Sequence, residues 1–162
     1  MTEPAVDAFR AVMRRVPTAV TVVTTIVEGK PKGFTANAFA SVSADPAMIL
    51  ICVNRQARSH PLIAAAGHFC VNILRLDQRA IAERFASHDV ADPFATIAYR
   101  IDRSGSPVFD DALAYLDCEL ANDYEAGTHT IFIGRVLACV ARDGAPLGYF
   151  NGDYRDFKCT IP

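Results

Sequence analysis

Apolar residues recur at helical spacing near the start of the chain. Positions i, i+3, i+4 and i+7 of one helix face carry Phe9, Val12, Met13 and Val16. This pattern predicts a helix over residues 4–15 that Pro17 ends. We expect the apolar stripe of this helix to pack against a sheet.

The next part of the chain has the composition of β-strands. Residues 18–27 are dense in Val, Thr and Ile and predict a strand. Residues 28–31 predict a turn, and residues 32–43 predict the returning strand of a hairpin. After the turn at Asp45 and Pro46, residues 47–54 form a nearly continuous apolar run, which predicts a strand buried on both faces.

Two short helices interrupt the later strands. The first is expected at residues 60–66, with Ser59 as its N-cap and Gly67 at its end, and the second at 78–85, capped by Asp77. Further strands are expected at 69–74, 99–102, 114–122 and 129–140, and the last two form a long hairpin. Many strands with sparse helices predict a mainly β fold, a β-barrel rather than a doubly wound sheet. No linker or repeat divides the chain, so we expect one domain over residues 1–162.

Within the hairpin, residues 33–43 are unusually small and polar. Alternation along one strand puts Phe34, Ala36, Ala38 and Ala40 on one face and Thr35, Asn37, Phe39 and Ser41 on the other. Small side chains allow close backbone approach, and the polar ones can hydrogen-bond the edge of a flat heterocycle. An edge strand whose polar face meets water has the same pattern.

Composition excludes several kinds of partner. The chain has 162 residues, a formal net charge of -2 and 51% hydrophobic residues, which is typical of a globular protein. It has no run of basic residues, so neither nucleic acid nor an anionic membrane is an expected partner. The N-terminal residues lack the pattern of a signal peptide, and a cytoplasmic location is expected.

The five cysteines indicate neither a metal site nor a redox dithiol. They are widely spaced, without a C-x-x-C pair, at Cys52, Cys70, Cys118, Cys139 and Cys159. An odd number of cysteines in a chain of this kind favours reduced, mostly buried thiols. Cys52, within the apolar run of residues 48–53, is expected to lie in the core.

The chain lacks the two common sequence motifs of phosphate-binding loops, so a phosphate would have to be bound by another segment. Neither G-x-G-x-x-G after a strand nor G-x-x-x-x-G-K-[ST] occurs. Residues 54–59 leave a buried strand and enter a helix, and they bring Arg55, Arg58 and backbone N–H groups to one place. This segment is a candidate phosphate cradle, although a solvated loop with a Ser cap has the same composition.

Separated motifs in the chain occur in a recognisable order. They are Phe9-Arg10, Val16-Pro17-Thr18, Gly33 to Phe39, Ser41-Val42-Ser43, Leu116-Asp117-Cys118, residues 131–136 and Tyr154-Arg155. In this order they resemble the flavin reductase family of FMN-binding split barrels, a Greek-key type of β-barrel, over about residues 9–157. The resemblance implies an NAD(P)H:flavin oxidoreductase, commonly a homodimer, that supplies reduced FMN or FAD to a partner monooxygenase.

The resemblance also implies roles for individual residues. The isoalloxazine would be lined by Thr35, Ala36 and Asn37, with Ser41 and Ser43 near the ring edge or ribityl chain. The strand beside the flavin would contribute Cys52, Val53 and Asn54, and the phosphate end Arg58 and Ser59. The remaining cofactor-binding positions are Phe85, next to the flavin, and Tyr154 and Arg155 at the rim. His129 matches a histidine that contacts the nicotinamide nucleotide.

Small neighbours would leave His129 accessible at the start of its strand. Hydride transfer from nicotinamide to flavin needs stacking and exclusion of water rather than a protein base. We therefore expect His129 to position the nicotinamide.

Other functions remain open at this stage. A related reductase with bound FMN could pass electrons to another acceptor, such as a cobalt corrinoid, and a flavin-binding module need not turn over at all. The sequence decides neither FMN against FAD nor NADH against NADPH. A 2′-phosphate would call on a cation near the ribose, and Arg135, Arg142 and Arg155 are candidates.

Overall fold

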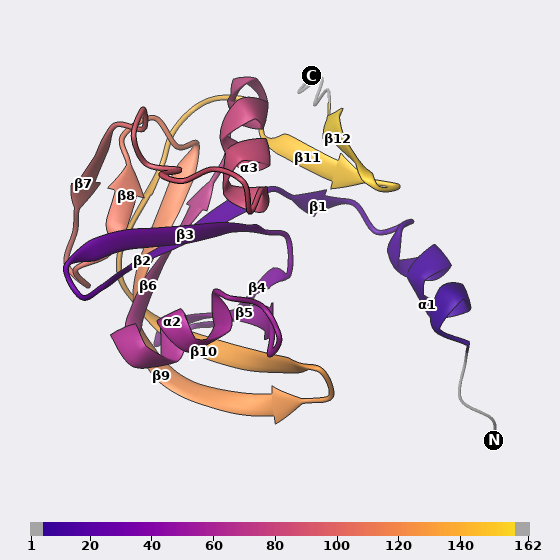
Figure 1. The fold of residues 1–162 in the computed structure, drawn as a ribbon, viewed down its shortest axis with the longest axis horizontal. Helices are drawn as coiled ribbons and strands as arrows, with labels where there is room; N and C mark the ends of the chain where they lie inside the picture. The colour runs from indigo at the N-terminus through magenta and orange to yellow at the C-terminus, as the bar shows by residue number, and fades with distance from the viewer. Residues whose placement is uncertain (1–4, 158–162) are drawn as a thin grey trace.

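The computed structural model describes residues 5–157, and Figure 1 shows their arrangement. Its largest element is a seven-stranded antiparallel sheet in the order β3-β2-β6-β9-β10-β5-β4. The bounds of these strands in chain order are β2 Thr21–Val27, β3 Lys30–Ala36, β4 Phe39–Ala44, β5 Ala47–Asn54, β6 His68–Ile73, β9 Ala114–Ala126 and β10 His129–Ala141.

Smaller elements surround this sheet. A three-stranded sheet joins β1 (Thr18–Ala19), β11 (Leu147–Phe150) and β12 (Asp153–Asp156), and a two-stranded sheet pairs β7 (Tyr99–Ile101) with β8 (Pro107–Phe109). The helices are α1 (Val6–Met13), α2 (His60–Ala66), the 3₁₀ turn η1 (Leu76–Gln78) and α3 (Arg79–Ala86). No helix within residues 5–157 is long and apolar enough to cross a membrane.

The connection between β3 and β4 makes the sheet close on itself. These strands are the two outermost in the sheet, and six spacings of about 4.8 Å would put them about 29 Å apart if the sheet were flat. Only Asn37 and Ala38 join them, and a link of this length spans at most about 11 Å. The sheet therefore curls into a barrel, and the N–H of Cys52 on β5 donates to the carbonyl of Ala38 at 2.9 Å.

This closure corrects one sequence expectation. The predicted single strand over residues 32–43 is two strands, one paired with β2 and the other with β5. Glu28 and Gly29 have φ of 52° and 73°, as a tight hairpin turn requires, so β3 begins at Lys30 inside the predicted turn. Faces assigned by continuous alternation through residues 37–38 are wrong, because the chain changes direction there.

Two hydrophobic clusters hold the barrel. One cluster fills its interior and includes Val23, Ile51, Phe69 and Phe132. The other lies beneath α3, where Phe85 packs edge-on against Phe94 with ring centroids 4.9 Å apart. Together they exclude water from both faces of the central strands, which is the main favourable contribution to folding.

Strand β5 is buried on one face only. Ile49, Ile51 and Val53 are buried, while Met48, Leu50 and Cys52 between them are half-buried. The prediction of burial on both faces is wrong because β5 belongs to an antiparallel sheet, next to the edge strand β4. Cys52 is accordingly half-buried rather than in the core, although burial still raises the pKa of its thiol.

Helix α1 does not pack against the sheet as expected. It stands apart from the barrel in Figure 1, and none of its residues is buried. Its apolar stripe is exposed, with exposed fractions of 64% for Val12 and 58% for Phe9. Helical spacing located the helix correctly, but it could not say what covers the stripe.

Both expected side-chain caps are wrong, although the helices lie close to their predicted positions. Ser59 has helical backbone angles and makes no capping hydrogen bond, and Asp77 lies within η1, where it pairs with Arg75 at 2.8 Å. Gly67 ends α2 in the left-handed conformation, as expected. Strands β8, β11 and β12 were not predicted, because three or four residues are too few to show an alternating pattern.

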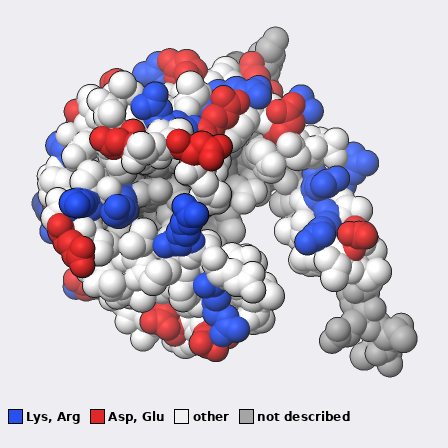
Figure 2. Space-filling model, in the orientation of Figure 1, with Lys and Arg blue, Asp and Glu red and all other residues white. Residues whose placement is uncertain are grey.

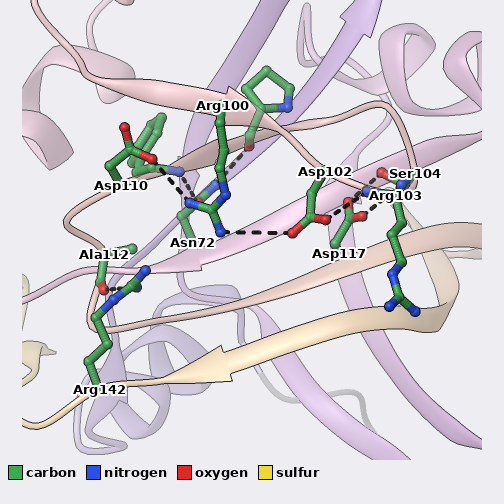
Figure 3. A network of polar contacts seen from close by, with 11 residues as sticks. Asn72, Arg100, Asp102, Arg103, Ser104, Asp110, Ala112, Asp117 and Arg142 are labelled. Atoms are coloured by element: carbon green, nitrogen blue, oxygen red, sulfur yellow. Dashed lines mark hydrogen bonds and ion pairs between the residues drawn. The ribbon is translucent and has the colours of Figure 1, made fainter.

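A buried polar network joins the small sheet to the barrel (Figure 3). Asp117 on β9 is fully buried and accepts hydrogen bonds from the N–H of Ser104, at 2.7 Å, and from its hydroxyl. The Ser104 hydroxyl also contacts that of Ser106, which lies 2.7 Å from Nδ1 of His68. Burial raises the pKa of Asp117 despite the opposing effect of these hydrogen bonds, and burial lowers the pKa of His68.

Asp117 predicts a pH dependence of stability. The pKa of Asp117 in the folded state lies above its unfolded value, which is near 3.9, so the folded state binds this proton more tightly. The contribution of Asp117 to the free energy of unfolding therefore falls as pH rises from the unfolded pKa through the folded pKa. Urea denaturation should show that Asp117→Asn removes this fall. The control Asp123→Asn, at an exposed position of the same strand, should retain the wild-type profile. Identical profiles for Asp117→Asn and the wild type would contradict the assignment.

Candidate functional site

Three hollows bring predicted site residues together. The β3 hollow, of about 390 Å³, runs along the edge of β3, and its lining includes Arg58, Ser59 and Phe85. The tyrosine hollow, of about 210 Å³, is lined by Val20, Thr35, Ala36, Asn37, Ala86, Tyr149 and Tyr154. The histidine hollow, of about 700 Å³, is lined by Arg10, Asn54, Arg55, Gln56, Thr128 and His129.

The end of β3 supplies small residues and backbone to the tyrosine hollow. Ala36 has no bulk to fill it, and Asn37 is exposed at the turn toward β4, where its amide donates to the Thr18 hydroxyl at 3.3 Å. The Thr35 hydroxyl donates to the carbonyl of Ala82 on α3 at 2.6 Å. Thr35 therefore fixes β3 against α3 through its side chain. The sequence had suggested a hydroxyl free to bind a ligand, but in the structure this hydroxyl is already hydrogen-bonded.

On β5 the predicted residues differ in how they face the site. The side chain of Val53 is 3% exposed and packs in the barrel interior, so its backbone alone is available to a ligand. Asn54 is exposed at the end of the strand, and its Oδ1 accepts the N–H of Gln56 at 2.8 Å. This hydrogen bond shapes the loop that carries Arg58 toward the β3 hollow.

Phe85 and Gly33 set how closely α3 approaches β3. Phe85 is 5% exposed and belongs to the cluster beneath α3, and its ring also lines the β3 hollow. A Cβ added at Gly33 would lie 2.9 Å from that ring. Because Gly33 has no side chain, the Phe85 ring can lie directly against β3, where it gives the hollow an apolar surface.

His129 lies opposite Asn54 in the β5–β10 ladder. Its ring is half-buried, and Nδ1 shares a hydrogen bond with the Thr128 hydroxyl at 2.9 Å. No carboxylate is hydrogen-bonded to this ring in the part of the chain that the structure describes. This setting suits a group that positions a ligand through hydrogen bonds.

Of the remaining candidates, only Tyr154 lines one of the three hollows. Ser41 and Ser43 flank a bulge on the edge strand β4, and neither lines the three hollows. Tyr154 lines the tyrosine hollow with Tyr149, whose ring centroid is 5.7 Å away. Arg155 is exposed on the neighbouring position and pairs with Asp153 at 3.2 Å.

Two lysines were missed by the sequence reasoning. Lys30 and Lys32 line the β3 hollow together with Arg58. Assigning residues 28–31 to a turn hid Lys30, but the alternation Lys30, Lys32, Phe34 was visible in the sequence. In Figure 2, Lys and Arg side chains gather beside the central hollow, in the region between β3 and α2.

The arginines proposed for a 2′-phosphate already have partners. Arg135 donates through Nε to Glu119 at 2.6 Å, Arg142 donates to the carbonyl of Ala112 at 2.7 Å (Figure 3), and Arg155 pairs with Asp153. None of them lines the three hollows. The structure thus offers no free guanidinium among these candidates within residues 5–157.

Comparison with known proteins decides the family. A family model described as the flavin reductase like domain matches residues 13–158. The chain belongs to this family. The "Probable flavin reductase" of Rhizobium meliloti (strain 1021) is 42% identical over 149 residues, which cover 91% of this chain and 46% of that protein. The chain therefore spans about half the length of that relative.

Flavin reductase relatives of more similar length also match. The reductase component of 4-nitrophenol 4-monooxygenase/4-nitrocatechol 2-monooxygenase from Rhodococcus opacus is 40% identical, over 92% of this chain and 80% of that protein. The solved structure of the NADH:FAD oxidoreductase SgcE6 from Streptomyces globisporus has a TM-score of 0.91 at 35% identity, over 99% of this chain and 98% of that one. The predicted split-barrel fold is confirmed.

Thr35→Val tests the hydrogen bond that holds β3 against α3. Loss of the hydrogen bond from the Thr35 hydroxyl to the Ala82 carbonyl is expected to lower the free energy of unfolding by about 1 kcal/mol, measured by urea denaturation. Thr35→Ser keeps the hydroxyl and should lose less than about 0.5 kcal/mol. Equal losses in the two variants would show that the hydroxyl contributes nothing.

Proposed function

We propose that this protein transfers a hydride from NADH or NADPH to FMN or FAD and supplies the reduced flavin to a partner monooxygenase. The observation that carries the proposal is the meeting of a small-residue strand end, Thr35 to Asn37, with the basic β3 hollow on a flavin reductase fold. The proposal takes residues 1–162 as one working domain.

The donor set fits a flavin. Ala36 and the exposed amide of Asn37 leave room and polar groups for the isoalloxazine, near the backbone of residues 52–54 and the rim at Tyr154. Arg58 and Ser59 line the β3 hollow, where a guanidinium and a hydroxyl can bind the phosphate. Phe85 supplies an apolar surface, while Ser41, Ser43 and Arg155 have more distant roles at the rim.

The residues of this chain act by positioning. A bound flavin accepts the hydride and stores the electron pair. The chain holds the flavin ring against small residues, so that a nicotinamide can stack on its open face with His129 hydrogen-bonded to the nicotinamide nucleotide. The apolar ring of Phe85 would exclude water from one side of the β3 hollow.

A monooxygenase partner and a homodimer complete the proposal. The Rhodococcus opacus relative is named as the reductase component of such an oxygenase. The exposed apolar stripe of α1 supports burial against a second copy, since exposed patches of this kind mark interaction surfaces. Cys52, Cys70, Cys118 and Cys139 are free thiols, which suits the reducing cytoplasm.

Anaerobic stopped-flow mixing with NADH tests the activity. Loss of the visible absorbance of oxidised flavin is expected, and its continuation over many equivalents of added FMN or FAD would establish flavin as a substrate. Loss of one tightly bound equivalent alone would support a prosthetic flavin with another acceptor. Flavin binding without bleaching by NADH or NADPH would contradict the reductase function.

His129→Ala separates positioning from proton transfer. We expect the KM for NADH to rise about tenfold with a smaller change in kcat, because binding contacts are lost without loss of a catalytic base. His129→Asn retains a hydrogen-bonding side chain and should recover part of the affinity. A fall in kcat of more than about a thousandfold at saturating NADH, with fold and flavin affinity intact, would refute the positioning role.

Light scattering after size exclusion tests the homodimer. The wild type should have about twice the chain mass of 17.6 kDa. Val12→Glu places a charge on the exposed stripe of α1 and should favour the monomer. Val90→Glu, at an exposed apolar position outside α1, is the matched control and should remain dimeric. A monomeric wild type that binds flavin stoichiometrically would contradict the dimer.

A further inference from the structure

The β3 hollow gathers more positive charge than a single phosphate group needs. Lys30 and Lys32 come from β3, and Arg58 comes from the loop before α2, so three cations from two separate segments line one cavity. The lining contains one carboxylate, Asp92, whose Oδ1 accepts the N–H of Phe94 at 2.9 Å. The cavity is therefore strongly basic in a protein whose net charge is -2.

These cations also lack the ion-pair partners that several arginines elsewhere have. Arg55 pairs with Glu125 at 2.9 Å, and Arg79, Arg100, Arg135 and Arg155 pair with carboxylates as well. Within residues 5–157, no ion pair involves Lys30, Lys32 or Arg58. Three cations line this cavity with one carboxylate, Asp92, so positive charge is in excess there and binding of an anion is favoured.

The direction of β3 places the lysines toward the site. Lys30 and Lys32 alternate with Phe34, which packs against the barrel interior, so all three lie on the same face of the strand. β3 pairs with β2 along one side only, and its other edge borders the hollow. Lysines on an edge strand also block strand addition, but that role requires neither a cavity nor Arg58 in the same lining.

We propose that the β3 hollow binds the ADP half of a dinucleotide, with Lys30 and Lys32 at its diphosphate. The proposal rests on the proposed function, in which Arg58 and Ser59 receive the phosphate next to the flavin. FMN ends at that phosphate and leaves both lysines without an anion. A dinucleotide continues with a second phosphate and adenosine, which extends the ligand along β3.

The size and remaining lining of the hollow suit this extension. Its volume of about 390 Å³ lies within the range of small-molecule sites. Besides the lysines, the lining includes Pro31, His88 and Pro93, which offer flat surfaces to an adenine ring. FAD and the nicotinamide dinucleotides both contain ADP, and binding measurements distinguish these two sources.

The test compares ligands that share or lack the ADP half. Dissociation constants for FMN, FAD and ADP itself are measured by calorimetry, and the KM for NADH is measured with saturating FMN. The variants are Lys30→Gln/Lys32→Gln and the control Arg103→Gln, which removes an exposed charge from the turn between β7 and β8, outside the hollow (Figure 3). Thermal unfolding checks that each variant folds.

The expected result is selective loss of ADP-containing ligands. Removal of both lysines should weaken ADP binding at least about tenfold, and Arg103→Gln should change it less than about twofold. A matching loss for FAD with unchanged FMN assigns the ADP half to FAD. A matching rise in the KM for NADH with unchanged FAD assigns it to the nicotinamide dinucleotide. Either result supports the site.

Two results would overturn the inference. Equal weakening of FMN and FAD would place the lysines at the part of the flavin that both share, and unchanged binding of every ligand would leave them without a role in the hollow. The stopped-flow assay of the wild-type protein tests the reductase function independently: if NADH still bleaches the flavin, the reductase function holds even when the inference about the hollow fails. Absence of that bleaching would count against the proposed function, whereas direct ADP binding would still report on the hollow.

Discussion

The two-residue connection at Asn37 and Ala38 is the constraint on which the architecture depends. It joins the two outermost strands of a seven-stranded sheet, so the sheet cannot remain open at that end. Closure brings the end of β3 beside β5, as the Cys52–Ala38 hydrogen bond shows, and leaves small residues where bulky ones would fill the barrel mouth. The site is a consequence of how the barrel closes.

Sequence patterns predicted the elements better than their surroundings. Apolar spacing located α1, the abundance of β-branched residues located β2, and a continuous apolar run located β5, because these patterns are local. The division of residues 32–43 into two strands depends on which neighbours they pair with, and that information is non-local. For the same reason the sequence could not reveal that the Thr35 hydroxyl is taken by Ala82. Family resemblance, rather than spacing, supplied most candidate site residues.

The cations of the protein differ in whether a carboxylate pairs with them. Arg100 is held by Asp110 at 3.0 Å and belongs to the network that joins the small sheet to the barrel. Lys30, Lys32 and Arg58 border the β3 hollow without an ion-pair partner in residues 5–157. Because these three cations line the same cavity, the excess of positive charge there attracts anions.

A crystal structure of the protein with bound flavin tests the central claim most directly. The account predicts that the isoalloxazine lies against the backbone of residues 35–38, with its phosphate at Arg58 and Ser59 in the β3 hollow. A flavin bound elsewhere, with residues 35–38 free of contact, would show that closure of the barrel at Asn37 and Ala38 does not create the site.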